Sequence, residues 1–382
     1  MIDRLTITNF KAFAFADISL APYTLLSGLN SSGKSTVLQA LALLRQASSQ
    51  GHLHDDDSGG FPLNGELVEL GTGRDVLHED YVAQPGSEAE IGFRLSTGSV
   101  TPSEWRARCG LDDDFLPLTF CDPPDESPEF LEEGDEDAFT LFNPGFQYLR
   151  ADRVNPAVTY PRSEQMSVRR RFLGTRGEYT VDYLRHYQDE AVQFAALLHS
   201  DVSPRLLAQT EAWMSEICPG VRIQATAIEQ TDLVRLSFQF TRARQLTSEA
   251  RRPTNVGFGL AYVLPVIIAC LTARPGSMIL LENPEAHIHP QGQSAMARLT
   301  CAAAAIGAQL VVETHSDHIL NGVRLAVKRG LLPAEDVALH YFQRQDDGIH
   351  IVSPAIGPDG MLSRWPPGFF DEWDRSLDQL LD

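Results

Sequence analysis

Cysteine is scarce in this chain of 382 residues, and its placement excludes two kinds of protein. Disulfide-rich secreted scaffolds and cysteine-ligated zinc modules both need closely spaced cysteines. Here there is no CxxC pair and no histidine at zinc-ligand spacing from a cysteine. We therefore expect reduced thiols that serve mainly as packing groups; they are Cys109, Cys121, Cys218, Cys270 and Cys301.

Long hydrophobic runs are also nearly absent. One uncharged, mostly apolar segment, VGFGLAYVLPVIIACLT, covers residues 256–272 and contains two glycines and a proline. A membrane-spanning helix needs roughly 20 apolar residues, so we predict a buried helix here and no membrane insertion. The first residues, MIDRLTITNFKAF, lack the basic start and apolar centre of a signal peptide, which makes the cytoplasm the expected location.

Positive charge is in short supply, because 31 lysines and arginines face 51 aspartates and glutamates, for a net charge of -20. This balance disfavours a surface that coats nucleic acid indiscriminately through its phosphates. Nine carboxylates and three prolines lie within Asp122–Asp137, which indicates a solvated loop. Two small basic clusters fit either a solvated surface or a nucleic-acid contact; they are Arg169–Arg171, and Arg242, Arg244, Arg251 and Arg252.

Strand and helix patterns alternate at both ends of the chain. At the start we predict strands at 5–8, 16–20 and 23–27 and then a helix at 35–46. The last third is predicted to hold an apolar helix from residue 259, a strand at 278–281, a helix at 291–305 and a strand at 309–312. Different material lies between, with predicted strands at 65–71, 89–96, 146–153 and 233–242 and a helical pattern at 180–217. This arrangement indicates one α/β nucleotide-binding sheet interrupted by a large insertion.

The segment GLNSSGKST joins the predicted strand at 23–27 to the helix at 35–46 and fits the pattern G-x-x-x-x-G-K-[ST]. Glycines let such a loop wrap around phosphate oxygens, and the helix that follows points unpaired N–H groups at the anion. Lysine neutralises phosphate charge and the serine hydroxyl binds Mg²⁺. The sequence therefore predicts that ATP and Mg²⁺ bind at Asn30, Ser31, Ser32, Gly33, Lys34, Ser35 and Thr36.

A phosphate site of this kind needs a carboxylate to support the metal ion. Glu282 ends the apolar run at 278–281 and precedes a proline and a helix, which favours a metal-supporting role over that of a solvated strand-end acid. His315 lies at the end of the predicted strand at 309–312, between a threonine and a serine, where it is placed to donate a hydrogen bond to phosphate. A lone histidine is more often structural, so the motif context decides this assignment.

Together four segments carry a family likeness: LTITNFKAF with GLNSSGKSTVLQAL, VGFGLAYVLP, ENPEAHIHP and ETHSDHIL, with a weaker match at YLRADRVNP. They resemble the SMC/RecF/OLD branch of ABC-type ATPases, above all the OLD-like bacterial AAA ATPases often found in antiphage defence operons. The resemblance implies an ABC-type P-loop NTPase fold with a mixed central sheet and a mostly helical insertion. We expect residues 1–100 and 251–382 to form the ATPase head and 101–250 the insertion.

The resemblance also implies how the site works. Two subunits would face each other and enclose two ATP molecules, with Lys34 and Ser35 binding ATP in one subunit. The loop Asn255–Gly259, including Gly257 and Gly259, would contact the γ-phosphate held by the opposing subunit. His315 would sense the γ-phosphate from its own subunit.

The sequence departs from this family in three places. The acidic pair expected at 282–283 is Glu282-Asn283, and an amide cannot accept a proton. Asn283 could still orient the attacking water, and Glu285 could take the base role. Ala261-Tyr262 stands where relatives often carry Ser-Gln. The residues after His315 show no acidic nuclease cluster, so we expect any nuclease activity to come from another chain.

Three functions remain open on these residues. The first is a slowly hydrolysing, ATP-dependent dimerising sensor or scaffold for a separately encoded nuclease or other toxin in antiphage defence. The second is a RecF-like repair ATPase that binds DNA, and the third is a structural subunit that binds ATP without hydrolysing it. Zinc binding by His287 and His289 is disfavoured, because no third and fourth ligands stand at suitable spacing.

Overall fold

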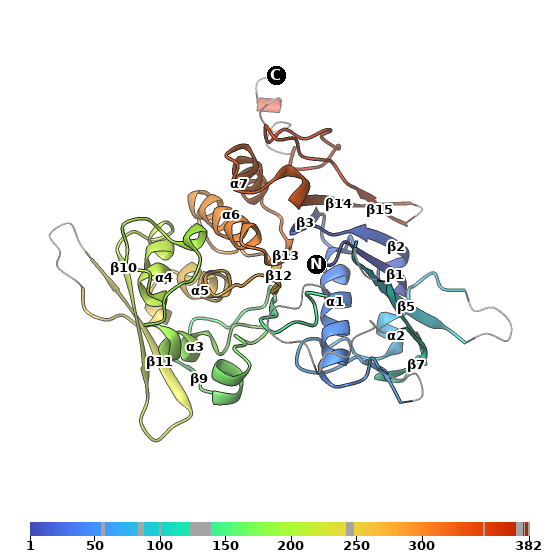
Figure 1. Cartoon of the computed structure of the whole chain (residues 1–382), viewed down its shortest axis with the longest axis horizontal. Coiled ribbons are helices and arrows are strands. Elements are labelled where there is room, and N and C mark those ends of the chain that lie inside the picture. The colour runs from blue at the N-terminus through green and yellow to red at the C-terminus, as the bar shows by residue number, and fades with distance from the viewer. Residues whose placement is uncertain are drawn as a thin grey trace.

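An antiparallel sheet forms the N-terminal lobe of the protein, as seen in a computed structural model (Figure 1). The structure describes residues 1–382 apart from 55–57, 83–87, 99–100, 123–138, 242–247, 347, 372–376, 378 and 381–382. Most of the predicted acidic loop, and Arg242 and Arg244, therefore lie outside the described residues. The strand order is β2-β1-β5-β6-β7-β4, with bounds Phe13–Ser19, Arg4–Phe10, Glu90–Ser96, Ser103–Arg108, Phe115–Asp122 and Gly60–Pro62.

A second, mixed sheet crosses the centre of the molecule in the order β15-β14-β3-β13-β12-β8. All its strands run parallel except β15. The carboxyl ends of β3, β12 and β13 therefore meet at one edge, which is where parallel sheets place their ligand sites. The bounds are Gly348–Val352, Val337–Gln345, Tyr23–Gly28, Gln309–Glu313, Met278–Glu282 and Gln147–Leu149.

The mixed sheet is buried on both faces. Leu26 and Leu280 point to the core around helix α1 (Lys34–Ser49), which lies between the two sheets, while their neighbours Leu25 and Leu281 point to the opposite core. Helices α5 (Phe258–Leu271), α6 (Pro290–Ala305) and α7 (Asp317–Lys328) cover that second face. Burial on both faces explains why β3, β12 and β13 are continuous apolar runs rather than alternating ones.

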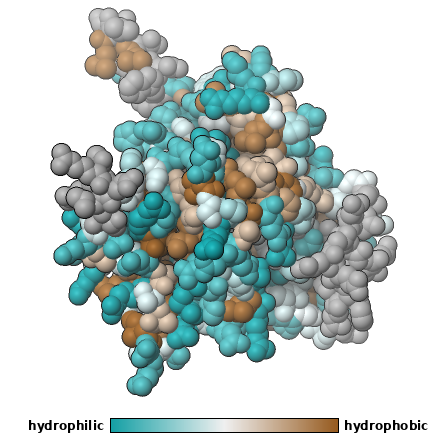
Figure 2. Space-filling view, turned by 60° about the vertical axis from the view of Figure 1, so that its left-hand side comes forward, coloured by the Kyte–Doolittle hydropathy of each residue, from teal (hydrophilic) through white to brown (hydrophobic). Residues whose placement is uncertain are grey.

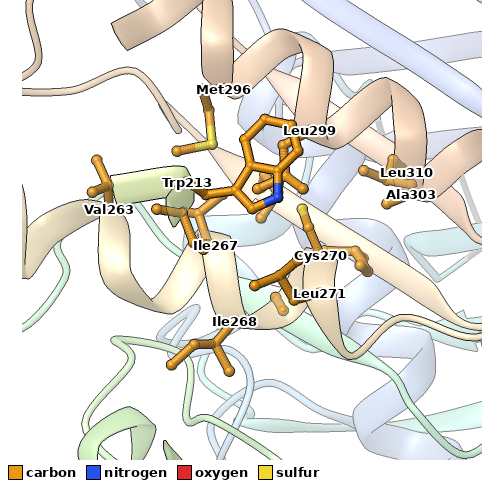
Figure 3. Packing of buried hydrophobic residues seen from close by; sticks show 14 of the residues in the cluster. Trp213, Val263, Ile267, Ile268, Cys270, Leu271, Met296, Leu299, Ala303 and Leu310 are labelled. Atoms are coloured by element: carbon orange, nitrogen blue, oxygen red, sulfur yellow. The ribbon is translucent and has the colours of Figure 1, made fainter. Parts of the chain in front are cut away.

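The second core is packed around Trp213, which reaches from helix α4 (Leu206–Ser215) onto α5 and α6 (Figure 3). Its indole N–H donates to the carbonyl of Leu197 at 2.9 Å, so the ring is buried without an unsatisfied donor. Figure 3 shows aliphatic side chains of α5, Met296 and Leu299 around it. The apolar segment at 256–272 is thus a core helix. Within the described part of the chain, no helix is long and apolar enough to cross a membrane.

The insertion differs from the prediction in its helix content. It was expected to be mostly helical, but besides α3 (Thr180–Tyr187) and α4 the range 101–250 holds β6, β7 and β8 and a three-stranded sheet, β10-β11-β9. The helical pattern at 180–217 is broken after α3, because Ala191 forms a bridge with Arg205 and Pro204 cannot continue a helix. The strands of the small sheet are Val221–Ala227, Leu233–Phe240 and Thr159–Pro161.

The strand predicted at 65–71 is also absent from the structure. The backbone N–H groups of Leu67 and Val68 donate instead to the side chain of Gln46 on α1, at 2.8 and 3.2 Å. The side-chain amide of Gln46 thus accepts the hydrogen bonds that the carbonyls of a neighbouring strand would otherwise accept. The remaining short elements are α2 (Gly73–Val76), a π-helix at Glu164–Arg169 and 3₁₀ turns at Ala195–Leu197, Pro253–Asn255 and Ala334–Asp336.

A buried histidine in the mixed sheet makes stability depend on pH. His340 on β14 lies 2.7 Å from Ser353 Oγ through Nδ1 and 2.7 Å from the Ser19 carbonyl through Nε2, an arrangement that suits the neutral ring. Burial lowers the pKa of His340 from 6.5. Its protonation therefore favours the unfolded chain, so its contribution to stability is present above about pH 6.5 and is lost as pH falls below that value.

We expect this contribution to fall by up to about 1.4 kcal/mol per pH unit below the unfolded pKa. Urea unfolding of wild type and His340→Gln at about pH 7.5 and 5.5 measures this loss. The glutamine keeps a donor toward Ser19 but removes the titrating ring. The variant should lose less stability than wild type between the two pH values. His54→Gln, at an exposed position, serves as the control. Equal pH dependence in wild type and His340→Gln would contradict the assignment.

Candidate nucleotide-binding site

The loop between β3 and α1 can form only with glycine at two of its positions. Gly28 has a φ of +140°, and a Cβ there would lie 2.3 Å from the carbonyl oxygen of Phe342. Gly33 has a φ of +95°, and a Cβ there would lie 2.8 Å from the ring of Phe13. Both residues meet the conditions that only glycine satisfies without strain. The pattern G-x-x-x-x-G-K-[ST] is thus matched by the backbone as well as by the letters.

Lys34 and Ser35 begin α1 directly after this loop. The buried Lys34 ammonium donates to the carbonyls of Gly28 and Leu29 at 3.1 and 2.7 Å. Burial lowers the pKa of Lys34, against the attraction of Glu313. Of the other predicted loop residues, Asn30 and Ser31 are exposed, whereas Ser32 and Thr36 are buried.

A carboxylate that we did not assign from the sequence faces both of these side chains. Glu313, at the end of β13, accepts a hydrogen bond from the Ser35 hydroxyl at 2.8 Å and lies 3.8 Å from Lys34 Nζ. Burial, together with the carboxylate of Glu282, raises the pKa of Glu313 to about 7, against the hydrogen bond from Ser35 and the charge of Lys34. Glu313 therefore joins the site residues, and the only sequence signal for it is its place next to Thr314-His315.

Glu282 lies beside Glu313, because these two residues are paired in the parallel register of β12 and β13. Its carboxylate accepts from the Tyr148 hydroxyl at 2.6 Å and from the backbone N–H of Ala151 at 2.8 Å. The predicted metal-supporting residue is thus at the expected edge of the sheet, held by β8 and the residues after it. Glu313, rather than Glu282, makes the direct contact with Ser35.

Asn283 follows β12 in a left-handed conformation, with a φ of 45°, which asparagine tolerates better than most residues. Its backbone N–H donates to the carbonyl of Glu313 at 2.8 Å. The buried guanidinium of Arg153 donates to the carbonyl of Asn283 at 3.1 Å and stacks over the Tyr262 ring. The side-chain oxygen of Asn283 is buried and has no hydrogen-bond partner among the described residues. The backbone of Asn283 is thus fixed while its amide oxygen is available.

Glu285, two residues after Asn283, lies beside His315. One oxygen of Glu285 accepts from the backbone N–H of His315 at 3.1 Å, and the other is buried without a partner in the part of the chain that the structure describes. Burial raises the pKa of Glu285. His315 is exposed, and partial burial together with the charge of Lys34 lowers its pKa. His315 follows two residues after Glu313, which accepts a hydrogen bond from Ser35, so the predicted γ-phosphate sensor lies near the phosphate-binding loop.

The loop at Asn255–Gly259 lies against the segment that follows β12. A Cβ on Gly259 would lie 2.4 Å from the carbonyl of His287, and the ring of Phe258 packs edge-on to His287 with 4.7 Å between centroids. Gly257 is exposed. His287 thus belongs to an aromatic cluster, and His289 caps α6 by accepting from Gln291. No group of three or more histidine, cysteine, aspartate or glutamate side chains that could hold a metal ion is found among the described residues.

The oxygens at this edge of the sheet fit a magnesium ion. Mg²⁺ prefers oxygen ligands and usually takes only one or two from the protein beside phosphates and waters. The Ser35 hydroxyl and the Glu313 carboxylate lie side by side, with Glu282 next to them, and these residues would hold the ion. Bound there, the ion would neutralise charge on the phosphates of ATP.

A comparison with protein families agrees with this geometry. Residues 24–321 match the family described as "AAA domain, putative AbiEii toxin, Type IV TA system". The chain belongs to this AAA family. Membership confirms the predicted P-loop ATPase domain and the α/β fold with a mixed sheet, and it implies nucleotide binding. A second family, described as a protein of unknown function (DUF3696), matches residues 332–380.

Solved structures similar to this AAA-family chain include heads of SMC proteins. One, bound to the C-winged helix domain of ScpA, has 14% identity and a TM-score of 0.49, over 93% of this chain and 97% of that chain. The head from Thermotoga maritima has 12% identity and a TM-score of 0.43, over 92% and 98%. A head with an extended coiled coil, from Pyrococcus furiosus, has 13% identity and a TM-score of 0.48, over 100% and 99%. No curated protein matches the chain.

Proposed function

We propose that this AAA-family ATPase is an OLD-like, nucleotide-dependent dimerising switch that hydrolyses ATP slowly. The observation that carries the proposal is a contrast within one site. The phosphate-binding loop has its lysine and its serine, yet the residue after Glu282 is an asparagine, which cannot accept a proton. Binding groups without the usual base favour a long-lived ATP-bound state over rapid turnover.

The proposed roles follow from the contacts of each residue. Lys34 and the loop residues 30–36 bind the phosphates, and Ser35 holds the metal ion with Glu282 and Glu313. Asn283 orients the attacking water through its unpartnered side-chain oxygen. Glu285, whose second oxygen also lacks a partner among the described residues, is the candidate base. Burial raises the pKa of Glu285, which makes this carboxylate a better proton acceptor than an exposed one.

The dimer would form through the loop Asn255–Gly259. In this proposal Gly257 and Gly259 contact the γ-phosphate bound by the opposing subunit, and His315 senses the same phosphate from its own side. The exposure of Gly257 and of Phe258, whose side chain is 40% exposed, supports this assignment. We also propose that residues 1–100 and 251–382 act as one head and that 101–250 serve as the insertion.

The proposed partner is a separately encoded effector, a nuclease or another toxin, in antiphage defence. The family description names a toxin of a Type IV toxin–antitoxin system, which supports a role in a paired system. The RecF-like alternative depends on two arginine clusters, Arg169–Arg171 and the one around Arg242. Each arginine of the first cluster lies within 4 Å of a carboxylate, at 3.4, 2.7 and 3.7 Å. This pairing reduces the positive charge that they offer to DNA.

Oligomeric mass with and without ATP tests the proposal. In wild type with Mg²⁺, ATP is expected to double the mass measured by sedimentation. Phe258→Asp should abolish this doubling, because a carboxylate there would repel the γ-phosphate of the facing subunit. Phe15→Asp is a matched control, since Phe15 is 67% exposed on β2 of the other lobe. An unchanged mass of wild type with ATP would refute the switch.

A further inference from the structure

A hollow of about 280 Å³ opens at the far end of α1 from the phosphate-binding loop. It is lined by Arg45 and Ser49 of α1, by the segment 142–146 that leads into β8, and by residues 169–172 after the π-helix. Arg45 lies 11 positions after Lys34 on the same helix, which places it about 16 Å away along the axis. The hollow is therefore separate from the ATP site but shares a helix with it.

The walls combine positive charge with aromatic rings. Three arginines line the hollow. Arg169 and Arg170 are paired with Glu164 and Glu66, so Arg45 provides the positive charge that no described carboxylate compensates. The rings of Phe142, Phe146 and Phe172 provide apolar surface. The guanidinium of Arg45 stands 5.4 Å from the Phe146 ring centroid, and that of Arg170 stands 5.5 Å from the Phe172 centroid. Cation–π contacts of this kind hold an arginine in place without neutralising it.

Arg45 is the unusual group in this hollow. Among the described residues, Arg45 donates one hydrogen bond, to the carbonyl of Leu141 at 3.2 Å, and no carboxylate lies within salt-bridge distance of it. Burial, together with the charge of Arg170, lowers the pKa of Arg45 to about 10, against the attraction of Glu66. Arg45 is half-buried, and an anion would stabilise a half-buried cation that stands beside a second cation. Glu66 is already bound by Arg170, at 2.9 and 2.7 Å.

We propose that this hollow binds a phosphate monoester of about nucleoside monophosphate size, with its phosphate on Arg45 and Arg170 and its organic part against the phenylalanine rings. Arginine forks match phosphate oxygens, and the apolar walls suit a flat organic group. At about 280 Å³ the hollow is slightly smaller than the usual small-molecule sites, which begin at about 300 Å³, so it suits a small ligand. A nucleic acid strand would need an extended basic groove, and the protein's net charge is -20.

Binding of adenosine 5′-monophosphate, measured by calorimetry with the phosphate-binding loop saturated by Mg²⁺ and ATPγS, tests the proposal. We expect one saturable AMP site per chain. Arg45→Met, which keeps an apolar stem, should weaken AMP binding at least about tenfold, as loss of a charge-assisted contact does. Arg170→Gln should weaken it as well. Arg108→Met, at an exposed arginine of β6, should leave it unchanged.

Thermal melting separates a binding defect from a folding defect. AMP should raise the melting temperature of wild type but not that of Arg45→Met. Without AMP the variant should melt no lower than wild type, because a half-buried charge without a carboxylate partner among the described residues has been removed. Absence of saturable AMP binding, or AMP binding that excess ATPγS displaces, would overturn the proposal. So would tight binding of a short DNA duplex that depends on Arg45 and that AMP does not compete with.

Discussion

Replacing Asn283 with glutamate is expected to raise the steady-state rate of ATP hydrolysis about 100-fold, because a positioned general base contributes at least that factor. The backbone of Asn283 is already fixed by Arg153 and by the carbonyl of Glu313. Its side-chain oxygen is buried without a partner among the described residues, so a carboxylate here would point into the same space. The new group would accept the proton of a water that Asn283 can only orient.

The measurement is phosphate release by Asn283→Glu and wild type at saturating ATP and Mg²⁺. Urea unfolding of both proteins accompanies it, because glutamate tolerates the left-handed conformation less well than asparagine, at a cost of about 1 kcal/mol. The paired variant Glu285→Gln identifies the base of the wild-type protein. A lower rate in Glu285→Gln, restored by adding Asn283→Glu, would assign that role to Glu285. An unchanged rate in Asn283→Glu with normal stability would show that proton transfer is not what limits this enzyme.

The phosphate-binding loop and the central strands could be predicted because their signals are local. A loop with glycines at fixed positions, between an apolar strand and an amphipathic helix, has few other structures available. The runs that became β3, β12 and β13 are short, apolar and bounded by turn residues, which is how strands buried on both faces look in a sequence. The same reasoning located Glu282 and His315 at strand ends that a parallel sheet brings to one edge.

Other features depend on contacts between distant parts of the chain and leave little local trace. Glu313 is assigned to the site by its hydrogen bond to Ser35, 278 positions away. Arg153 was expected at the end of a strand at 146–153, but β8 ends at Leu149, and the contact of Arg153 with Asn283 depends on β8 pairing with β12. The missing strand at 65–71 likewise depends on one side chain of α1, since Gln46 takes the backbone donors that a strand would have paired. Local patterns cannot predict such long-range hydrogen bonds.

The distribution of hydrophobic residues on the surface does not by itself identify the dimer interface. Figure 2 presents a mostly hydrophilic face on which hydrophobic residues lie in separate patches. Exposed apolar side chains scattered singly are normal for globular proteins and identify no partner. The exposed Phe258 gains meaning only from its place beside Gly257 and His287, and this place was not visible in the hydropathy of the sequence. We therefore propose the dimer interface from the position of Phe258 next to the nucleotide-binding site, and not from the composition of the surface.

Replacing Lys34 with alanine is expected to weaken ATP binding by about 100-fold, through the loss of charge-assisted hydrogen bonds to phosphate. The Lys34 ammonium is buried at the start of α1 and is the only positive side chain within salt-bridge distance of Glu313 among the described residues. Without Lys34, the phosphates of ATP lose a positively charged partner. They also face the carboxylates of Glu313 and Glu282 with less compensation, and both effects weaken ATP binding.

Equilibrium binding of ATP in the presence of Mg²⁺ measures this effect, with Lys328→Ala as the control, because Lys328 lies on the last turn of α7. Lys328→Ala should bind ATP as wild type does, and Lys34→Ala should also fail to form the ATP-dependent dimer. The ATP affinities of the two variants show whether the proposed switch depends on the phosphate-binding loop. If Lys34→Ala binds ATP as tightly as wild type, the nucleotide is held elsewhere and the switch loses its basis. If binding is lost together with the dimer, then the loop, the dimer and the proposed long-lived ATP state depend on one side chain.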